Sequence, residues 1–173
     1  MGIYEHSQEL RTFGTTKNSG DFGEIAVKEY LKRKFKCQIY DCSDIPKYRE
    51  KDIDFLYSVN DGKGWTSVEV KTDNRMSETG NIVVENAMFR KSGRVNGWLY
   101  YCEANILCFV DDNNYLFYFF DWAKLKSLIK EGKWKKRWFK NGTDNCNGEV
   151  YVIPLQDLFM EKDVVLFYDR LFN

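Results

Sequence analysis

The sequence predicts an α/β fold in which a mixed sheet is flanked by helices. Three observations predict it: an amphipathic helical segment early in the chain, several short extended segments separated by polar turns, and a second helical segment late in the chain. The chain has 173 residues, a length that suits one domain with a substantial core. Its composition, 43% hydrophobic and 17% aromatic, is typical of a globular protein and not of a disordered one.

The predicted elements follow the order helix, strands, short helix, strands, helix. Residues 1–19 are polar and are expected to form an irregular arm, whereas residues 20–173 are expected to form a single domain. The first helix is predicted at 21–35, where Asp21 and Glu24 have the spacing of a helix N-cap and its N3 partner. Strands are predicted at 37–40, 53–59, 65–71, 81–85, 106–110, 115–120 and 151–155, and a second helix at 122–130.

Polar turns indicate how these strands pair. Residues 60–64, with two glycines, join the second and third strands into a hairpin. Residues 111–114 join 106–110 and 115–120 into another hairpin. The aromatic run at 115–120 is expected to be a strand of the core that could also serve as a dimer surface.

Charge and residue counts exclude several classes of function. Lys and Arg number 26, as do Asp and Glu, so the chain is not held to nucleic acid by bulk charge, although a local basic groove remains open. The single histidine, His6, excludes Ser-His-Asp triads and multi-histidine zinc sites. The five cysteines form no C-x-x-C pair and are expected to be reduced core thiols. With no membrane-length apolar run and no signal-peptide pattern, we expect a cytoplasmic protein without a membrane partner.

The candidate catalytic residues lie on the hairpin of 53–59 and 65–71. Side chains alternate along a strand, so Glu69 and Lys71 share one face, and Asp54 can meet them from the neighbouring strand. Two adjacent carboxylates repel each other, and a hard divalent cation such as Mg²⁺ or Mn²⁺ relieves that repulsion. A lysine beside them can orient a water or stabilise a transition state. This set is sufficient for phosphodiester hydrolysis without histidine.

The E-x-K spacing alone is a weak signal. Residues 131–133 also match it, and residues 61–63 give the D-x-K form. We reject the first because it follows a helix and has a central glycine, and the second because it belongs to a turn. An ordinary exposed ion pair between Glu69 and Lys71 remains the alternative interpretation.

Residues 53–56 (Ile-Asp-Phe-Leu), a turn, and residues 68–71 (Val-Glu-Val-Lys) resemble the core motif of the PD-(D/E)XK nuclease superfamily. The resemblance spans about residues 20–120 and departs from the usual pattern at Ile53, where proline is common. It implies a restriction-endonuclease-like fold that uses Mg²⁺ or Mn²⁺. It further implies that Asp54, Glu69 and the Val70 carbonyl bind the metal, and that Lys71 is the catalytic lysine.

Three further acidic residues are weighed beside this motif. Glu24 resembles the additional helix acid of some branches, including archaeal Holliday junction resolvases, which implies an accessory catalytic role; the alternative is a capping-box glutamate. Asp52 could share the site if its strand begins that early. Glu85 could point toward the site if the strand at 81–85 adjoins the hairpin, or else face solvent at a sheet edge.

Two basic clusters are candidate nucleic-acid contacts. Cations suit phosphates, and interleaved rings suit unpaired bases. The alternatives are a solvated loop for the first cluster and, for the second, an amphipathic segment that buries its tryptophans. Lys28, Lys32 and Lys36 are expected to be a solvated helix face. The first cluster comprises Arg90, Lys91 and Arg94; the second, in the basic aromatic segment 122–140, comprises Lys133, Lys135, Lys136 and Arg137 with Trp134, Trp138 and Phe139.

The sequence therefore predicts a metal-dependent DNA endonuclease. The chain has little room for a separate sequence-reading domain, which favours selectivity for branched or junction DNA. Junction resolvases act as dimers, so the resemblance implies a homodimer. Two alternatives stay open: a non-catalytic nucleic-acid-binding or inhibitor protein on the same fold, and a restriction-type subunit that needs a partner.

Overall fold

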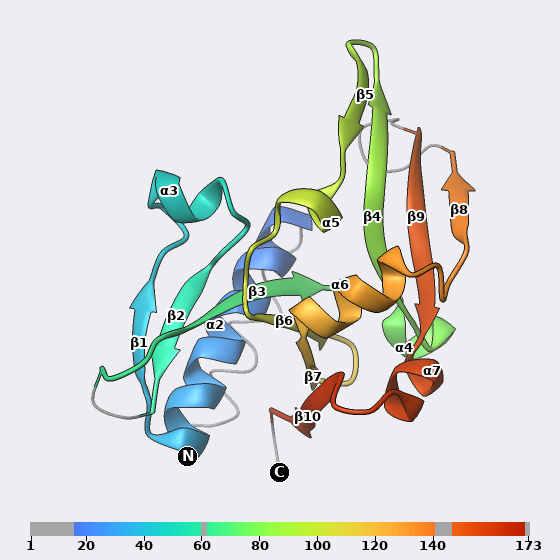
Figure 1. Ribbon diagram of the computed structural model, residues 1–173. Helices are drawn as coiled ribbons and strands as arrows, with labels where there is room; N and C mark the ends of the chain where they lie inside the picture. The colour runs from blue at the N-terminus through green and yellow to red at the C-terminus, as the bar shows by residue number, and fades with distance from the viewer. Residues whose placement is uncertain (1–15, 60–61, 141–146, 172–173) are drawn as a thin grey trace.

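The computed structural model describes residues 16–59, 62–140 and 147–171, with side chains described from Gly20 onward. Two sheets and the helices around them form the molecule (Figure 1). The helices are α2 (Thr16–Phe35), α3 (Pro46–Arg49), α4 (Met76–Thr79), α5 (Trp98–Tyr101), α6 (Trp122–Lys130) and α7 (Leu155–Met160). The strands are β1 (Gln38–Asp41), β2 (Phe55–Ser58), β3 (Thr66–Thr72), β4 (Asn81–Arg90), β5 (Gly93–Asn96), β6 (Ile106–Asp111), β7 (Leu116–Asp121), β8 (Lys136–Phe139), β9 (Asn147–Pro154) and β10 (Val165–Arg170).

The first sheet is mixed and confirms the predicted α/β class. Within the described residues its strand order is β1-β2-β3-β6-β7-β10. β3 and β6 run parallel, and the other neighbouring pairs are antiparallel. The connection from β3 to β6 is long because it contains α4, the first two strands of the second sheet and α5.

The second sheet is antiparallel, with the order β5-β4-β9-β8 in the described part of the chain. Its β4–β5 hairpin projects beyond the rest of the molecule (Figure 1). The strand predicted at 81–85 is the first half of β4, and β4 pairs with β5 and β9 and not with the β2–β3 hairpin. Periodicity in the sequence identifies a strand but not the sheet to which it belongs, so this second sheet was not predicted.

Two hydrophobic cores lie on opposite faces of the first sheet. On one face, Val27 and Leu31 of α2 pack against Val68 and Val70 of β3. On the other face, side chains of α5, α6 and the second sheet surround residues such as Leu107. Alternate residues of β3 therefore face α2, while the residues between them face the opposite side, where the candidate catalytic groups lie.

The first helix differs from the prediction at its start. α2 begins at Thr16, so Asp21 and Glu24 lie inside the helix and the predicted capping pair is wrong. An N-cap residue needs a non-helical backbone, and this helix runs through residue 21 without interruption. The predicted boundary of the arm is also wrong for residues 16–19, and residues 1–15, with His6, lie outside the described residues.

Other predicted elements agree with the structure. α6 has the predicted bounds, and β7 is a core strand in which Phe117, Phe119 and Phe120 are buried. Four cysteines are free and buried, as expected; Cys146 lies outside the described residues. Among the described helices, none combines the length and apolar character that crossing a membrane requires. The short helices α3, α4, α5 and α7 and the strand β10 were not predicted.

Candidate active site

The β2–β3 hairpin fixes Asp54 against β3. Phe55 pairs with Val68, and the Asp54 amide donates a hydrogen bond to the Val68 carbonyl at 3.0 Å. The Val70 amide in turn donates to Asp54 Oδ2 at 2.7 Å. The Asp54 carboxylate is therefore held by backbone on the strand that carries Glu69 and Lys71.

Lys71 joins the carboxylates into one group, which we call the β3 cluster: Asp52, Asp54, Glu69 and Lys71. Its ammonium forms ion pairs with Glu69 and, at 3.0 Å, with Asp52 Oδ2. The same nitrogen lies 5.3 Å from the centre of the Trp98 ring. The Glu69 side chain is only 4% exposed, so the alternative of an ordinary exposed Glu–Lys pair is wrong.

Asp52 enters the cluster through a turn and not through the strand. Its φ is 53°, a left-handed backbone conformation uncommon for residues other than glycine. This turn aims Asp52 at Lys71 from outside β2. The sequence left the residue open because strand parity alone could not place it. The D-x-D spacing of Asp52 and Asp54 is the feature of the sequence that could have placed Asp52 in the site. Nothing in the sequence indicates that Trp98 lies beside Lys71.

The cluster holds three carboxyl groups but one ammonium, so it has more acidic groups than its one cation can pair. Burial raises the pKa of both Asp54 and Glu69 above their ordinary values, against the opposing effect of Lys71. Burial alone would lower the pKa of Lys71, but the charges of Glu69 and Asp52 outweigh it and the pKa is raised. Glu69 Oε2 is buried and no donor reaches it in the described part of the chain, while the Asp54 carboxyl lies within hydrogen-bond range of the Glu69 side chain. Such an oxygen is costly unless a cation or donor reaches it.

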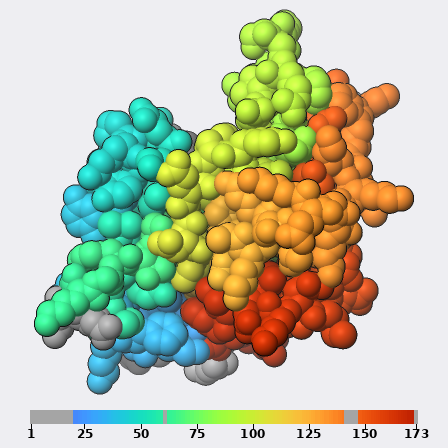
Figure 2. Space-filling model, in the orientation of Figure 1, coloured from blue at the N-terminus to red at the C-terminus, as the bar shows by residue number. Residues whose placement is uncertain are grey.

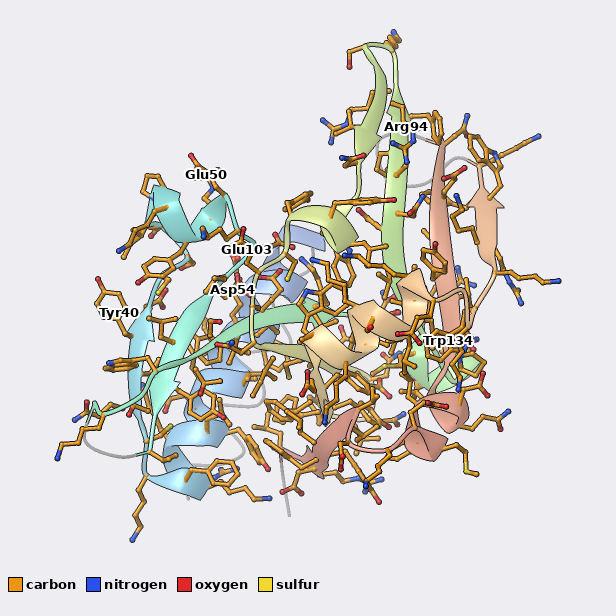
Figure 3. The ribbon with its side chains drawn as sticks, viewed as in Figure 1. Tyr40, Glu50, Asp54, Arg94, Glu103 and Trp134 are labelled. Carbon is orange, nitrogen blue, oxygen red and sulfur yellow. The ribbon has the colours of Figure 1, made fainter. Side chains whose placement is uncertain are left out.

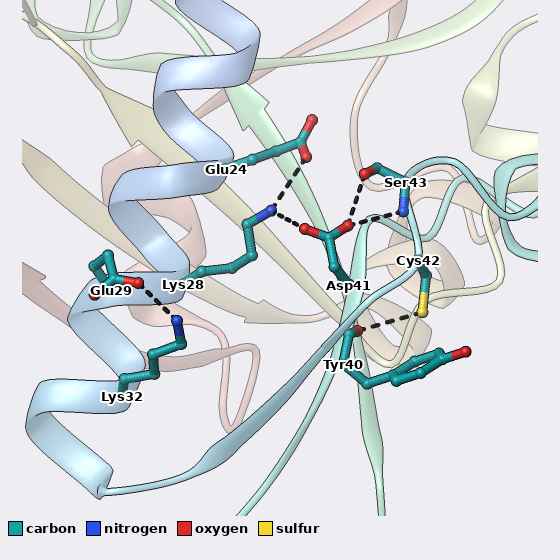
Figure 4. Close-up of polar contacts among 8 residues, drawn as sticks. All are labelled: Glu24, Lys28, Glu29, Lys32, Tyr40, Asp41, Cys42 and Ser43. Atoms are coloured by element: carbon teal, nitrogen blue, oxygen red, sulfur yellow. Dashed lines mark hydrogen bonds and ion pairs between the residues drawn. The ribbon is translucent and has the colours of Figure 1, made fainter.

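Glu24 approaches this group from α2. Burial and then the charge of Asp54 raise the pKa of Glu24 to about 7. The helix lies very close to β3 here, because a Cβ on Gly23 would come within 2.1 Å of Thr72 Oγ1. On its other side Glu24 is 3.9 Å from Lys28 Nζ, as Figure 4 shows. Glu24 is thus near the β3 cluster, not in direct contact with its lysine.

Lys28 is not part of a solvated helix face. Its Nζ lies 2.6 Å from Asp41 Oδ2, and its side chain is 13% exposed (Figure 4). Ser43 donates from its backbone and its hydroxyl to the same carboxylate, which links α2 to the end of β1. The prediction fails because α2 packs against this strand end. Lys32 is exposed, as predicted, and pairs with Glu29 at 2.7 Å.

Two side chains outside the first sheet lie within electrostatic range of the β3 cluster. Glu85 belongs to β4, and burial first raises its pKa while the charge of Lys71 lowers it. Tyr101 of α5 also has a raised pKa, through burial and then the charge of Asp52. Both side chains therefore lie within electrostatic range of the β3 cluster, although β4 does not adjoin the hairpin.

The residues present suit a divalent cation of the predicted kind. Within the described residues, no three His, Cys, Asp or Glu side chains converge on one point. Mg²⁺ does not require three, because it commonly keeps several waters and binds one or two carboxylates. Asp54 and Glu69 supply two carboxyl groups with hard oxygen donors, and one oxygen of Glu69 is buried without a donor. Val70, whose carbonyl is the third predicted ligand, lies between Glu69 and Lys71 on β3, and its side chain faces α2.

The two predicted basic clusters lie in the second sheet, at its two edges. Arg90 and Arg94 lie on the β4–β5 hairpin with Lys91 at its turn, all of them exposed (Figure 3 labels Arg94). Arg94 donates to Asn96 Oδ1 at 3.0 Å. The hairpin replaces the solvated loop considered from the sequence. The charges of this edge are directed to solvent.

The cations near β8, at the other edge, are only partly free to bind a ligand. Lys133 is ion-paired with Glu161, and Lys136 Nζ lies 3.6 Å from Glu149. Lys135 and Arg137 are exposed. The alternative, an amphipathic segment that buries its tryptophans and leaves its lysines in water, is therefore correct for only part of the cluster.

The tryptophans of this segment differ in role. Trp134 is 8% exposed and its indole N–H donates to Asp157 Oδ2 at 3.0 Å, so it is a core residue and cannot stack on a base. Trp138 is 50% exposed, with its ring centre 4.7 Å from that of Phe89 on β4. Trp138 alone of the two presents a ring to solvent.

Comparisons with known proteins give a limited result. No protein-family model matches the chain, and a search of curated proteins finds no match. Among solved structures, a bacterial homing endonuclease, I-Ssp6803I, is similar with a TM-score of 0.48 and 22% identity. The similarity covers 66% of this chain and 74% of that one.

Proposed function

We propose that the chain is a metal-dependent DNA endonuclease of the PD-(D/E)XK kind, with the β3 cluster as its active site. The observation that supports this most is the buried, unpartnered Glu69 oxygen beside Asp54 and Lys71. A protein that used this hairpin only for stability would gain from an apolar or fully satisfied set of side chains. Retaining buried acidic groups with perturbed pKa values favours a catalytic role.

The chain's own residues take the following roles in the proposal. Asp54 and Glu69 would hold Mg²⁺ or Mn²⁺, which when bound acidifies a water and neutralises phosphate charge. Lys71 remains protonated, because its pKa is raised, and donates hydrogen bonds from Nζ to a phosphate oxygen or the attacking water. Glu24, with a pKa of about 7, can hold or release a proton near neutral pH.

The proposed DNA path leads from the β3 cluster to the second sheet. The surface is hollowed between α3 and the segment around α5 (Figure 2). Asp54 and Glu103 lie between the same two elements (Figure 3). The exposed cations of the β4–β5 hairpin rise beyond it and would contact phosphates. Selectivity for branched or junction DNA, and action as a homodimer, remain parts of the proposal.

The test is a cleavage assay on labelled four-way junction, flap, single-stranded and linear duplex DNA. Wild type is compared with Lys71→Ala and Glu69→Gln in Mg²⁺, Mn²⁺ and EDTA. Lys32→Ala is the matched control, because Lys32 also pairs with a glutamate but on the exposed side of α2. We expect cutting only with a divalent cation, lost in both active-site variants and kept in the control.

Other outcomes separate the alternatives. Tight binding to one substrate without any cutting would overturn catalysis and support a binding or inhibitor protein. Cutting that appears only with a partner protein would identify a restriction-type subunit. Cutting of RNA but not DNA would overturn the proposed substrate. Equal cutting of linear and branched DNA would overturn the selectivity.

A further inference from the structure

A cavity of about 410 Å³ opens beside the β3 cluster, on the same face of the β2–β3 hairpin. Leu56 and Ser67 pair across the hairpin, and each lies two residues from Asp54 or Glu69. Two residues along a strand span about 7 Å and return to the same face. The walls of the cavity come from α3 and the residues after it, from the hairpin itself, and from residues 103 and 105 before β6.

The walls of the cavity suit a flat, partly apolar group. Tyr48 and Trp65 contribute aromatic rings, while Ile53 and Leu56 contribute aliphatic surface. Trp65 is 42% exposed, so its ring is accessible to a ligand. The cavity volume lies in the range of small-molecule pockets, which are mostly apolar with a few placed polar groups.

Asn105 supplies such a polar group in a fixed orientation. Its Oδ1 accepts hydrogen bonds from the Ser67 amide at 2.9 Å and the Ser67 hydroxyl at 2.8 Å. Because a backbone N–H can only donate, the atom facing it must be the oxygen. The NH₂ group of Asn105 is thereby directed elsewhere as a donor, which is the kind of group that reads an acceptor on a base edge.

Cations lie at the same cavity. Lys47 Nζ is 4.6 Å from the centre of the Tyr48 ring. Lys51 pairs with Glu103, but the two side chains are 49% and 59% exposed, and exposed pairs contribute little. Lys47 and Lys51 are both exposed, so their ammonium groups can turn to a phosphate next to the cavity.

We infer that this cavity receives a nucleobase that has left the stack one or two nucleotides from the scissile phosphate. The inference rests on the proposed function and deepens it. The stacked rise is about 3.4 Å per nucleotide, so about 7 Å separates the active site from a base no more than two steps away. Aromatic walls, an oriented donor and flanking cations together match a nucleotide. Substrates with a base already unpaired at the cut would bind at the lowest cost, which gives branched DNA its advantage.

A thermodynamic cycle tests the inference without cleavage. Binding of a fluorescent junction in EDTA is measured with every base present and with one abasic residue, placed in turn at each position across the branch point. Wild type is compared with Trp65→Ala and with Asn105→Asp, which keeps the acceptor for Ser67 but loses the donor. Tyr168→Ala is the control, because Tyr168 is also an exposed ring, 60% accessible, but on β10.

For each protein we take the ratio of its affinity for the intact junction to its affinity for the abasic junction. At one position near the branch, we expect this ratio to be about tenfold lower in Trp65→Ala than in wild type. Asn105→Asp should also reduce that ratio, and Tyr168→Ala should leave it unchanged. No coupling at any position in either cavity variant would overturn the inference. If wild type cleaved DNA but showed no coupling, the nuclease proposal would stand and the nucleobase cavity would be overturned. If it showed coupling but did not cleave DNA, the cavity would bind a base and the nuclease proposal would be overturned. Absence of binding to any DNA would overturn both.

Discussion

The β2–β3 and β4–β5 hairpins of the protein carry charge in opposite ways. The first draws the largely buried carboxyls of Asp54 and Glu69 together with Lys71, in a group with more acidic than basic side chains. The second presents Arg90 and Arg94 to solvent on a projection beyond the body of the molecule. In the described strands, the first hairpin lies inside the mixed sheet, between β1 and β6, while β5 of the second hairpin is an edge strand of the antiparallel sheet.

The difference separates two requirements of a nuclease. Charges that act on a reacting phosphate are most effective where water is excluded, because the local dielectric is low. Charges that attract and position a long polyanion are most effective where they are exposed, since counterion release supplies the free energy. The buried hairpin should therefore determine turnover, and the exposed one affinity.

The largest expected effect is that of Glu69→Gln on cleavage. The substitution keeps the shape of the side chain but removes its acid group, so the proposed cation site and the ion pair with Lys71 would both be lost. We expect the cleavage rate with Mg²⁺ to fall at least about 100-fold, while affinity for DNA in EDTA changes less than about threefold. Single-turnover kinetics and fluorescence anisotropy measure the two quantities. Glu29→Gln is the control, because Glu29 pairs with Lys32 on the exposed side of α2. Cleavage near the wild-type rate would remove the β3 cluster from the reaction.

The exposed hairpin should give the converse result. Replacing Arg90, Lys91 and Arg94 together with alanine is expected to weaken binding about 10- to 100-fold at low salt. The slope of log affinity against log salt should fall by up to about 3, one for each phosphate that the variant no longer neutralises, with turnover at saturating DNA unchanged. Lys32→Ala is the control, because Lys32 is paired with Glu29 on the exposed side of α2. A loss of turnover at saturation would contradict the division between the two hairpins.

The local sequence predicted the β2–β3 hairpin well, because the strands and the turn that form it are close together in the chain. The alternation of apolar and charged residues from 68 to 71 indicates which side chains face the core against α2. The short turn before this strand determines that β2 pairs with it. Asp52 escaped this reasoning, because its position depends on a left-handed turn that alternation does not encode.

Features that depend on distant parts of the chain were not predictable in the same way. The sequence identified β4 but not its partner β9, which lies about sixty residues further along the chain. Lys28 has the pattern of an exposed helix residue, yet it is largely covered because β1 ends with Asp41 beside it. Nothing in the surrounding sequence distinguishes Trp134 from Trp138. The structure does, because Asp157 of α7 accepts a hydrogen bond from Trp134.

A smaller effect is expected at Glu24, at the margin of the buried cluster. Its pKa is raised from 4.5 to about 7, so the folded state favours the neutral acid and loses stability as pH rises between these values. Glu24→Gln should therefore match wild type below about pH 4.5 and exceed it by about 1–2 kcal/mol above pH 7, the full shift being reduced by partial exposure. Urea denaturation across this pH range measures the difference. If wild type and Glu24→Gln were equally stable at pH 8, neither burial nor the charge of Asp54 would raise the pKa of Glu24.

The smallest effects should distinguish the two tryptophans of the second sheet. Trp134→Phe removes the hydrogen bond to Asp157, and we expect it to lower the free energy of unfolding by about 1 kcal/mol without changing DNA affinity. Trp138→Ala removes a half-exposed ring, and we expect stability to change by less than about 0.5 kcal/mol while affinity for single-stranded DNA falls about threefold to tenfold. Denaturant titration and anisotropy test both variants. If Trp138→Ala left affinity for single strands unchanged, the second sheet would bind DNA through its cations alone, and only the cavity beside the β3 cluster would remain as a place for an unpaired base.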